Sequence, residues 1–381
     1  MPFAYVDAFV SLLGVSMSWK RSVIDRVFLL TAKSISRSKK IPEIPKSIFV
    51  LRNNDIGDLL IITPLFESLR QRFPDAHIVV GMGNWNVEIL KLNPYISEIL
   101  PVNAPWHNNF IANQSLWNAL NYIAFSPESQ ELAKRHFDIG IDVLGSYFGS
   151  LLMIRAGIPH RLGVKGYAGG HTAVEKYVEY NAYEQVGRSA LRFAELLGAT
   201  ELPECRPQIF LSASELEAGQ RRWSIKIRLT EKRIVIGPGG GFAEKCWPLE
   251  NYADLVKMLR EISNLEVIII GGKQDREAGK QLAALSPSVK SLAGDLTLRE
   301  SFALVAAADL VISNSSMLMH AAAAFSIPTV VLLGDCFTST KQHAAQWGYP
   351  GICQILGKES DRQEVYTPQE VRKFIGRLLE I

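Results

Sequence analysis

Short apolar runs rich in β-branched residues alternate with helical patterns twice along this chain of 381 residues. The first series begins at Ile48–Leu51 and continues with a helical pattern over 61–72 and an apolar run over 77–81. The second series begins at 233–236 and keeps the same order of elements without repeating the sequence. Strands that alternate with helices predict parallel sheets covered on both faces. We therefore expect an α/β protein with two doubly wound, Rossmann-like domains facing a central cleft.

Three regions are expected along the chain. Residues 1–45 form a basic, amphipathic helical extension with a linker, residues 46–207 an N-terminal domain, and residues 208–381 a C-terminal domain. A chain of this length can bury two separate cores. Residues 166–171, which contain three glycines, are predicted to form a mobile loop.

The basic charge of the protein is concentrated at its N-terminus. Residues 1–40 contain seven Lys or Arg and two Asp, a net charge of +5, whereas the remaining 34 basic and 36 acidic residues give −2. The nearly neutral body has no basic footprint for nucleic acid. The apolar clusters of 1–40 are typical of helices on an anionic membrane surface, and equally of an extra helix packed on the body.

The cellular compartment is inferred from the cysteines and the N-terminus. Cys205, Cys246, Cys336 and Cys353 show no CxxC pair and no metal-ligand spacing, which favours a reducing, cytoplasmic compartment. The N-terminus lacks the features of a signal peptide, and its longest uncharged run is too short to span a bilayer. We expect a cytoplasmic protein that can associate with the inner face of the cytoplasmic membrane.

Two carboxylates, Asp55 and Asp58, lie in the turn after the first predicted strand. In a parallel sheet this turn faces the ligand crevice, although Asp55 also suits a purely conformational role in a turn. Asp142 ends another predicted strand, where it can orient an acceptor or cap the next segment. Arg161 is a candidate for contact with an acidic acceptor, and the alternative is a solvated surface charge.

The second half contains candidate phosphate-binding features. A glycine loop at 237–241 precedes Lys245 but matches neither standard nucleotide-binding motif, so turn geometry alone remains an alternative. The polar residues of 313–316 open a predicted helix whose free N–H groups and dipole favour an anion. His320 lies one turn into this helix, where it can bind phosphate or simply pack.

Several of these motifs recur in a fixed order over about residues 48–334. They are Leu51-Arg52 with Gly57-Asp58, Thr63-Pro64-Leu65, Asp138-Ile139 with Ile141-Asp142, Lys245 with Trp247-Pro248, Gly271-Gly272 with Asp275, and Asn314-Ser315-Ser316 with His320. This order resembles glycosyltransferase family 9, which includes the lipopolysaccharide heptosyltransferases that use ADP-heptose. The resemblance implies a GT-B fold and an inverting transfer without a metal or a cofactor, with the acceptor on the first domain and the nucleotide sugar on the second.

The resemblance also implies roles for individual residues. Asp58 matches the family's catalytic carboxylate and would act as general base on the acceptor hydroxyl. The residues that match the donor side are Gly240, Gly241, Lys245, Lys273, Gln274, Asn314, Ser315, Ser316 and His320. Of these, Lys245 would bind the diphosphate, and Lys273 and Gln274 fall near the usually acidic position that holds the nucleoside.

The sequence departs from the family pattern near the donor helix. Ser315 and Met317 stand where many members have Asp and Gly, so the resemblance implies a heptose or related sugar without fixing it. The expected acceptor is a lipopolysaccharide core or another cell-surface glycan. The alternatives are a sugar-nucleotide-binding scaffold protein with an eroded donor site, and a sugar-nucleotide epimerase of the same fold.

Overall fold

The computed structural model describes residues 40–223, 231–262, 264–358 and 366–380. The N-terminal extension expected over 1–45 lies almost entirely outside these residues. The chain divides into two compact units. The first contains the described residues up to Val87 together with Asn93–Asn181 and Gly187–Cys205, and the second contains Glu88–Leu92, Ala182–Val186 and the described residues from Arg206 onward.

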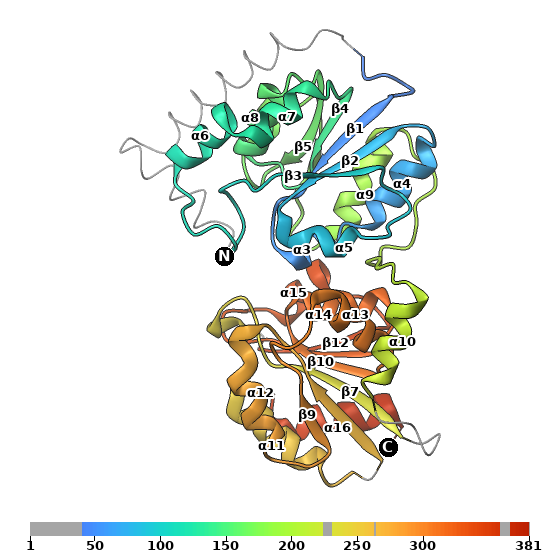
Figure 1. Cartoon of the computed structure of the whole chain (residues 1–381), viewed down its shortest axis with the longest axis vertical. Helices are drawn as coiled ribbons and strands as arrows, with labels where there is room; N and C mark the ends of the chain where they lie inside the picture. The colour runs from blue at the N-terminus through green and yellow to red at the C-terminus, as the bar shows by residue number, and fades with distance from the viewer. Residues whose placement is uncertain (1–39, 224–230, 263, 359–365, 381) are drawn as a thin grey trace. The chain divides into compact units, whose positions relative to one another are not determined.

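The first unit contains a parallel sheet of six strands in the order β3-β2-β1-β4-β5-β6 (Figure 1). The strands are β1 (Ser47–Leu51), β2 (His77–Met82), β3 (Glu98–Pro101), β4 (Ile139–Asp142), β5 (His160–Lys165) and β6 (Lys176–Glu179). The helical segments of this part of the chain are α3 (Ile56–Leu60), α4 (Pro64–Arg72), η1 (Asn84–Asn86), α5 (Val87–Leu90), α6 (Leu116–Phe125), α7 (Pro127–Lys134), α8 (Tyr147–Arg155), η2 (Gly170–Ala173) and α9 (Val186–Leu196). The strand order reverses between β1 and β4, so the loops after these two strands flank the switch point.

The two faces of this sheet bury alternate residues of β1, as the two-residue period of a strand requires. Phe49 and Leu51 pack in one cluster with side chains from α6, α7 and α8. Ile48 and Val50 are also fully buried and point to the opposite face, where α4 and α9 lie (Figure 1). The run over residues 48–51 is therefore apolar at every position, which is why the strand is visible in the sequence.

The helix expected over 61–72 begins three residues later, as α4, and a separate short helix, α3, precedes it. Pro64 begins α4, because proline has no N–H to continue a preceding helix but fits the first turn of a new one. The shorter α3 begins at Ile56. Asp58 thus lies in the first turn of a helix and not, as the sequence suggested, in the turn before it.

Residues 166–171, predicted to form a mobile loop, make defined contacts with the start of α8, and their mobility stays a prediction. Gly170 N donates to Gly145 O at 2.9 Å, and Gly169 pairs with Ser146 in a β-bridge. A Cβ atom at Gly170 would lie 2.3 Å from Ser146 O. Gly169 and Gly170 therefore allow close packing against the start of α8.

The second unit contains another parallel six-stranded sheet, in the order β12-β11-β10-β7-β8-β9 (Figure 1). The strands are β7 (Lys232–Gly237), β8 (Leu265–Ile269), β9 (Val289–Ser291), β10 (Leu310–Asn314), β11 (Thr329–Leu332) and β12 (Cys353–Leu356). The helical segments are α10 (Ala213–Arg221), η3 (Ala243–Lys245), α11 (Leu249–Leu259), η4 (Lys273–Asp275), α12 (Arg276–Ala283), α13 (Leu298–Ala306), α14 (Met317–Ala324), α15 (Thr340–Trp347) and α16 (Pro368–Leu379). Here the switch point lies between β7 and β10.

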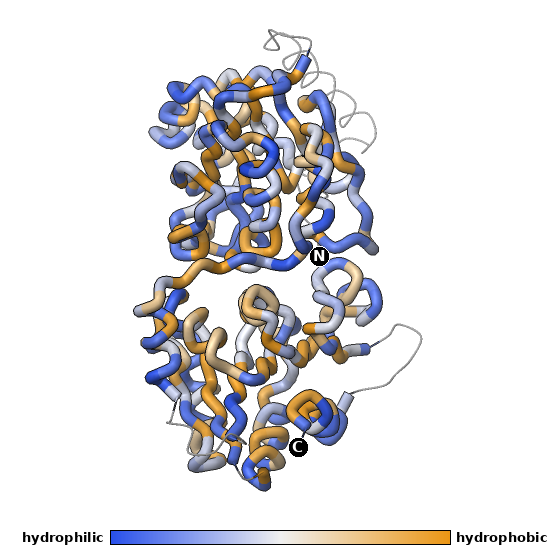
Figure 2. The backbone as a smooth tube through the Cα atoms, turned by 90° about the vertical axis from the view of Figure 1, so that its right-hand side faces the viewer, coloured by the Kyte–Doolittle hydropathy of each residue, from blue (hydrophilic) through white to orange (hydrophobic). Residues whose placement is uncertain are grey.

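Alternate residues of β7 again enter different cores. Ile234 and Ile236 pack with residues of α11 and α16, whereas Val235 packs with residues of α13 and α14. Hydrophobic and hydrophilic stretches alternate along the chain in both units (Figure 2). Each unit is therefore a sheet between two layers of helices.

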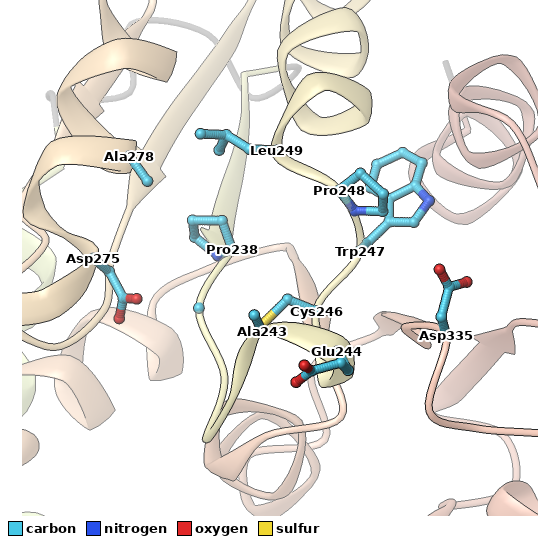
Figure 3. A pocket seen from close by; sticks show the side chains of 11 residues that line it. Pro238, Ala243, Glu244, Cys246, Trp247, Pro248, Leu249, Asp275, Ala278 and Asp335 are labelled. Atoms are coloured by element: carbon cyan, nitrogen blue, oxygen red, sulfur yellow. The ribbon is translucent and has the colours of Figure 1, made fainter.

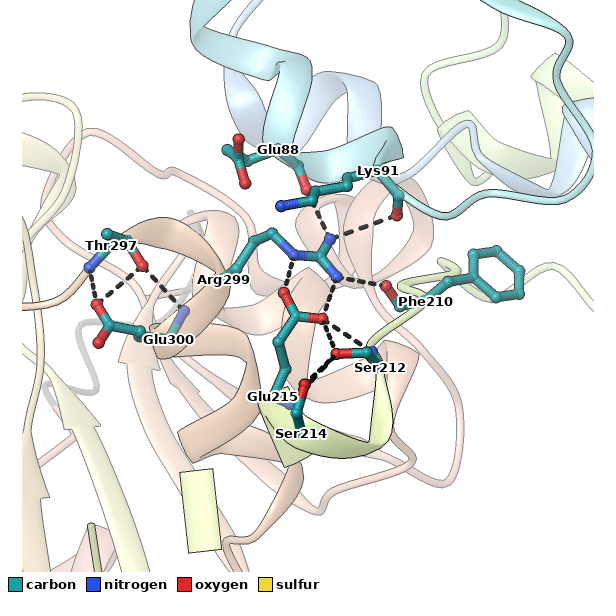
Figure 4. Close-up of polar contacts among 9 residues, drawn as sticks. All are labelled: Glu88, Lys91, Phe210, Ser212, Ser214, Glu215, Thr297, Arg299 and Glu300. Carbon is teal, nitrogen blue, oxygen red and sulfur yellow. Dashed lines mark hydrogen bonds and ion pairs between the residues drawn. The ribbon is translucent and has the colours of Figure 1, made fainter. Parts of the chain in front are cut away.

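A buried arginine organises part of the second unit. Arg299 on α13 has 4% of its surface exposed. Its guanidinium donates to Glu215 Oε2 at 2.8 Å, Phe210 O at 2.7 Å, Glu88 O at 3.0 Å and Lys91 O at 3.4 Å (Figure 4). A buried guanidinium has to be paired in this way, and the last two bonds explain why Glu88–Leu92 belongs to this unit.

Two further findings concern the described ranges as a whole. None of their helices has the length and apolarity needed to cross a membrane. All four cysteines carry free thiols.

Candidate active site

Asparagine side chains fix the turn that follows β1. Asn53 Nδ2 donates to Trp106 O at 3.0 Å, and Asn54 Nδ2 donates to His107 O at 2.7 Å. Asn54 O in turn accepts from Asn86 Nδ2 at 2.9 Å. Both asparagines of the turn are buried. The two asparagine side chains therefore fix the shape of the loop. A side chain that can contact a ligand has to be sought among the residues that follow.

Asp58 lies in the first turn of α3, directly after this turn, and places a carboxylate at the switch point of the first sheet. Its Oδ1 lies 3.1 Å from Arg52 Nη2, and Arg52 Nε donates to Asp58 O at 3.2 Å. The Arg52 side chain is 4% exposed and the Asp58 side chain 29%. Among the residues that the structure describes, Arg52 is the one partner of this carboxylate. The arginine thus orients a carboxylate that solvent and ligands can still reach.

The negative charge of Asp58 affects the pKa of the neighbouring Tyr167. Burial and then the Asp58 charge raise the pKa of Tyr167 to about 12. Burial and the positive charge of Arg52 lower the pKa of His107 to about 4. At neutral pH both side chains are neutral, so Arg52 and Asp58 carry the charges of this corner.

Asp55 and Asp142 are used by the backbone around them. Asp55 Oδ1 accepts from Asn109 N at 2.8 Å. Asp142 is buried and accepts from Leu144 N at 3.0 Å and Ser146 N at 2.8 Å. Burial raises the pKa of Asp142, and the backbone amides and Arg52 oppose that shift. For Asp142 the structure favours the turn-forming alternative, and Asp55 fixes the loop that contains Asn109.

Arg161 does not have the surface position that contact with an acceptor requires. Its side chain is 1% exposed, and its Nε donates to Ala173 O at 2.9 Å. Its Nη1 donates to Ile158 O and to Pro159 O. The guanidinium therefore joins backbone segments inside the first unit, and the expectation of an exposed charge is corrected.

In the second unit, Asn314 ties the ends of two strands to the glycine loop. Its Oδ1 accepts from Trp247 N at 2.9 Å and Tyr252 OH at 3.0 Å. Its Nδ2 donates to Pro238 O at 2.6 Å and Gly239 O at 3.1 Å. Both donors and the acceptor oxygen of this buried amide are thus occupied by the protein. Asn314 contributes to the candidate site through the backbone that it holds.

Lys245 is an available cation in the segment that Asn314 holds. No ion pair joins Lys245 Nζ to any residue within the described ranges. Burial, followed by the positive charge of Lys245, lowers the pKa values of His320 and His343 to about 3 each. The imidazoles are neutral, and His320 Nδ1 lies 2.6 Å from the Tyr349 hydroxyl. A lysine in such surroundings is suited to pair with an anionic ligand.

The two serines that follow β10 make different bonds, one within the helix start and one to a distant helix. Ser316 caps α14, and its Oγ accepts from Leu318 N at 3.3 Å. Ser315 Oγ lies 2.7 Å from His343 Nε2. The serines were predicted from the sequence as site residues, but His343 was not. The signal that could have found it is Ser339, a good helix N-cap four residues before it.

A pocket of about 480 Å³ opens beside the glycine loop (Figure 3). It is lined by Pro238, Gly239, Ala243, Glu244, Cys246, Trp247, Pro248, Leu249, Asp275, Ala278 and Asp335. Its walls thus combine apolar rings and side chains with three carboxylates. Such a lining can take a flat ring and accept hydrogen bonds from hydroxyl groups, but it offers a phosphate group no cation.

Asp275 is one of the three acidic residues that line this pocket. Its Oδ2 accepts from Gly272 N at 2.8 Å, and burial raises its pKa. A Cβ atom at Gly239 would lie 2.3 Å from Asp275 Oδ1, so the glycine admits the carboxylate to the loop. The family resemblance places the nucleoside position near Lys273 and Gln274, neither of which is acidic. Asp275, which follows directly, lines the pocket, and those two residues do not.

Comparison with known proteins identifies the family. The model of glycosyltransferase family 9 (heptosyltransferase) matches residues 128–353, more than half of the chain. The chain belongs to glycosyltransferase family 9. The lipopolysaccharide heptosyltransferase 2 of Escherichia coli strain K12 is 28% identical over 353 residues, which are 87% of this chain and 98% of that protein. The lipopolysaccharide heptosyltransferase 2 of Salmonella typhimurium is 28% identical over 364 residues, with the same coverage.

Solved structures of family 9 glycosyltransferases share the fold. The structure of the E. coli ADP-heptose lipopolysaccharide heptosyltransferase II has a TM-score of 0.67 at 23% identity and covers 88% of this chain and 98% of its own. The family 9 glycosyltransferase of Veillonella parvula has a TM-score of 0.72 at 19% identity and covers 90% and 99%. The predicted GT-B fold with two Rossmann-like domains is confirmed, and membership of the family makes this protein a glycosyltransferase.

Proposed function

We propose that this family 9 glycosyltransferase transfers a heptose or related sugar from a nucleoside diphosphate donor to a lipopolysaccharide core or another cell-surface glycan. The named relatives of E. coli and Salmonella are lipopolysaccharide heptosyltransferases. Solved neighbours include an E. coli heptosyltransferase with ADP and with ADP-2-deoxy-2-fluoro heptose. These names support a nucleotide sugar as donor and a lipopolysaccharide as acceptor.

Asp58 is the general base of the proposed reaction. The observation that carries this assignment is a part-exposed carboxylate, oriented by Arg52, at the switch point of the first sheet. The acceptor hydroxyl oxygen attacks the anomeric carbon and passes its proton to Asp58. The bond between that carbon and the diphosphate oxygen breaks, and its electron pair leaves with the diphosphate. One displacement of this kind inverts the anomeric centre.

The donor is bound by the second unit. The pocket with Asp275 accepts the nucleoside, because its carboxylates suit ribose hydroxyl groups and its apolar walls suit a base. Lys245 and the first turn of α14 meet the diphosphate, together with backbone amides of Gly240 and Gly241. This positive charge stabilises the leaving group in the role that a metal ion has in other transferases, so we propose a metal-independent transfer.

The decisive experiment replaces Asp58 by Asn, which keeps the size of the side chain and removes its basicity. Asp58→Asn should lower the transfer rate about 10²- to 10⁴-fold while ADP affinity, measured by calorimetry, stays unchanged. Asp254→Asn, at an exposed carboxylate paired with Lys257, is the matched control and should transfer normally. Normal transfer by Asp58→Asn, in protein with an unchanged melting temperature, would contradict the assignment. Isomerised donor sugar in a reaction without acceptor would instead indicate an epimerase.

A further inference from the structure

A second buried histidine reaches the start of the donor helix. His343 on α15 is 4% exposed, and its Nε2 lies 2.7 Å from Ser315 Oγ. The ring is fixed edge-on to Phe337, with 4.8 Å between the ring centroids. The position of α15 is fixed by its own cap, in which Ser339 Oγ accepts from Gln342 N at 3.1 Å. The imidazole is therefore held in one orientation against Ser315.

The surroundings of His343 determine which of its nitrogens carries the proton. The ring is neutral at neutral pH, so it has one N–H donor. Nδ1 is buried without a partner within the described part of the chain. An unpaired buried N–H is rarer in proteins than an unpaired acceptor. The hydrogen therefore sits on Nε2, which donates to Ser315 Oγ.

This tautomer sets the direction of the Ser315 hydroxyl. Because Ser315 Oγ accepts from His343, its own hydrogen points away from the imidazole. The described residues offer Ser315 no other hydrogen-bond partner. Ser313, by comparison, donates to Asn314 O at 3.0 Å. Ser315 thus presents an oriented donor beside the first turn of α14, where helix N–H groups also favour an acceptor oxygen.

We propose that His343 is a positioning residue that orients the Ser315 hydroxyl as a hydrogen-bond donor to an oxygen of the nucleotide-sugar substrate. The inference rests on the proposed function, since it concerns the same donor. The oxygen is a diphosphate oxygen or an oxygen of the sugar, and both accept a hydrogen bond from a hydroxyl. A carboxylate at position 315 would do the opposite and accept from sugar hydroxyl groups. The pair of residues therefore makes this donor site select for an acceptor oxygen.

The test uses two replacements of His343 that differ in reach. In His343→Gln the side-chain amide nitrogen takes the place of Nε2 and can still donate to Ser315. In His343→Asn it takes the place of Nδ1 and cannot reach Ser315. A merely structural role for the imidazole predicts equal effects from both. Affinities for ADP and ADP-heptose are measured by calorimetry on the full-length protein, with melting temperatures as the folding control.

We expect His343→Asn and Ser315→Ala each to weaken binding about 5- to 10-fold, the cost of one hydrogen bond. His343→Gln should stay within about 2-fold of the original protein, on the same scale of free energy. The double variant Ser315→Ala with His343→Asn should lose no more than either single variant, because both remove one interaction. Weaker binding of both probes would identify a diphosphate oxygen, and weaker binding of ADP-heptose alone a sugar oxygen.

The proposal is overturned if His343→Asn and His343→Gln bind alike, or if the losses in the double variant add. It is also overturned if the original protein binds neither probe. Transfer to an acceptor does not enter these measurements. If Asp58 proves not to be the general base, the binding result for His343 therefore still holds. If the proposal for His343 is overturned, the assignment of Asp58 as the general base is not affected.

Discussion

At the scale of single residues, Lys245 is a cation that no carboxylate within the described ranges neutralises. Lys245→Met should weaken ADP binding about 10- to 100-fold, the cost of losing a hydrogen bond to a charged group. The measurement is calorimetric titration with ADP. Lys257→Met, which removes an exposed lysine paired with Asp254, is the matched control and should bind normally. Equal affinities for the two variants would show that the diphosphate does not meet Lys245.

The buried histidines give the unfolding free energy a pH dependence. Burial lowers the pKa values of His320 and His343 from the ordinary 6.5 to about 3. Below pH 6.5 the unfolded chain therefore binds protons that the folded protein refuses, and stability falls as the pH decreases toward 3. Each such histidine contributes up to about 1.4 kcal/mol per pH unit. His343→Gln should reduce this slope in urea unfolding between pH 7 and 5, whereas His136→Gln, at an exposed histidine, should leave it unchanged.

The candidate residues differ in how far the sequence could define them. Asp58 and Lys245 follow strong apolar strands, so their placement at the ends of the two sheets could be expected. The burial of Arg161 could not be expected, because the sequence does not show which carbonyl groups surround an arginine in the folded protein. The pairing of Ser315 with His343 was equally hidden, since it depends on how α15 folds back over the end of β10. Tertiary contact, and not local pattern, decides these roles.

At the scale of secondary structure, the strands β1, β7 and β10 were predictable from the sequence, and the edge strands β9 and β12 were not. β1, β7 and β10 contain the buried apolar runs 48–51, 234–236 and 310–312, which stand out in the sequence. β9 has three residues and β12 four, with mixed burial. Strands this short carry no distinct period. The start of α4 at Pro64 was readable in principle, because proline marks a helix start.

The packing of α10 on α13 depends on a glycine. A Cβ atom at Gly219 would lie 2.2 Å from Ala303 O, so the two helices could not keep their present distance. Gly219→Ala should lower the unfolding free energy by about 1–3 kcal/mol, although alanine is the better helix former. Gln220→Ala, one exposed residue further along α10, should stay within about 0.5 kcal/mol. Urea unfolding measures both, and a neutral Gly219→Ala would show that α10 can shift freely.

At the scale of the whole molecule, the charge of residues 1–40 remains the basis of a proposed membrane association. We propose that this basic segment binds anionic lipid surfaces, because its net charge of +5 contrasts with −2 for the remainder. The full chain should sediment with vesicles that contain anionic lipid, and less so at higher salt. Deletion of residues 1–39 should abolish this sedimentation while ADP affinity, as the folding control, is retained. Unaltered vesicle binding by the truncated protein would rule the proposal out.

The amide of Asn314 has a consequence for reading mutational data. Its side chain bonds to Trp247 N and Tyr252 OH and to the carbonyl oxygens of Pro238 and Gly239. Its replacement would therefore let both the glycine loop and the segment that contains Lys245 move from their positions. A mutational scan scored on substrate turnover would rank this asparagine among the ligand contacts, although the hydrogen-bonding groups of its side chain are already occupied by the protein. Loss of activity on mutation at this site therefore identifies residues that hold the backbone in place as well as residues that contact the substrate.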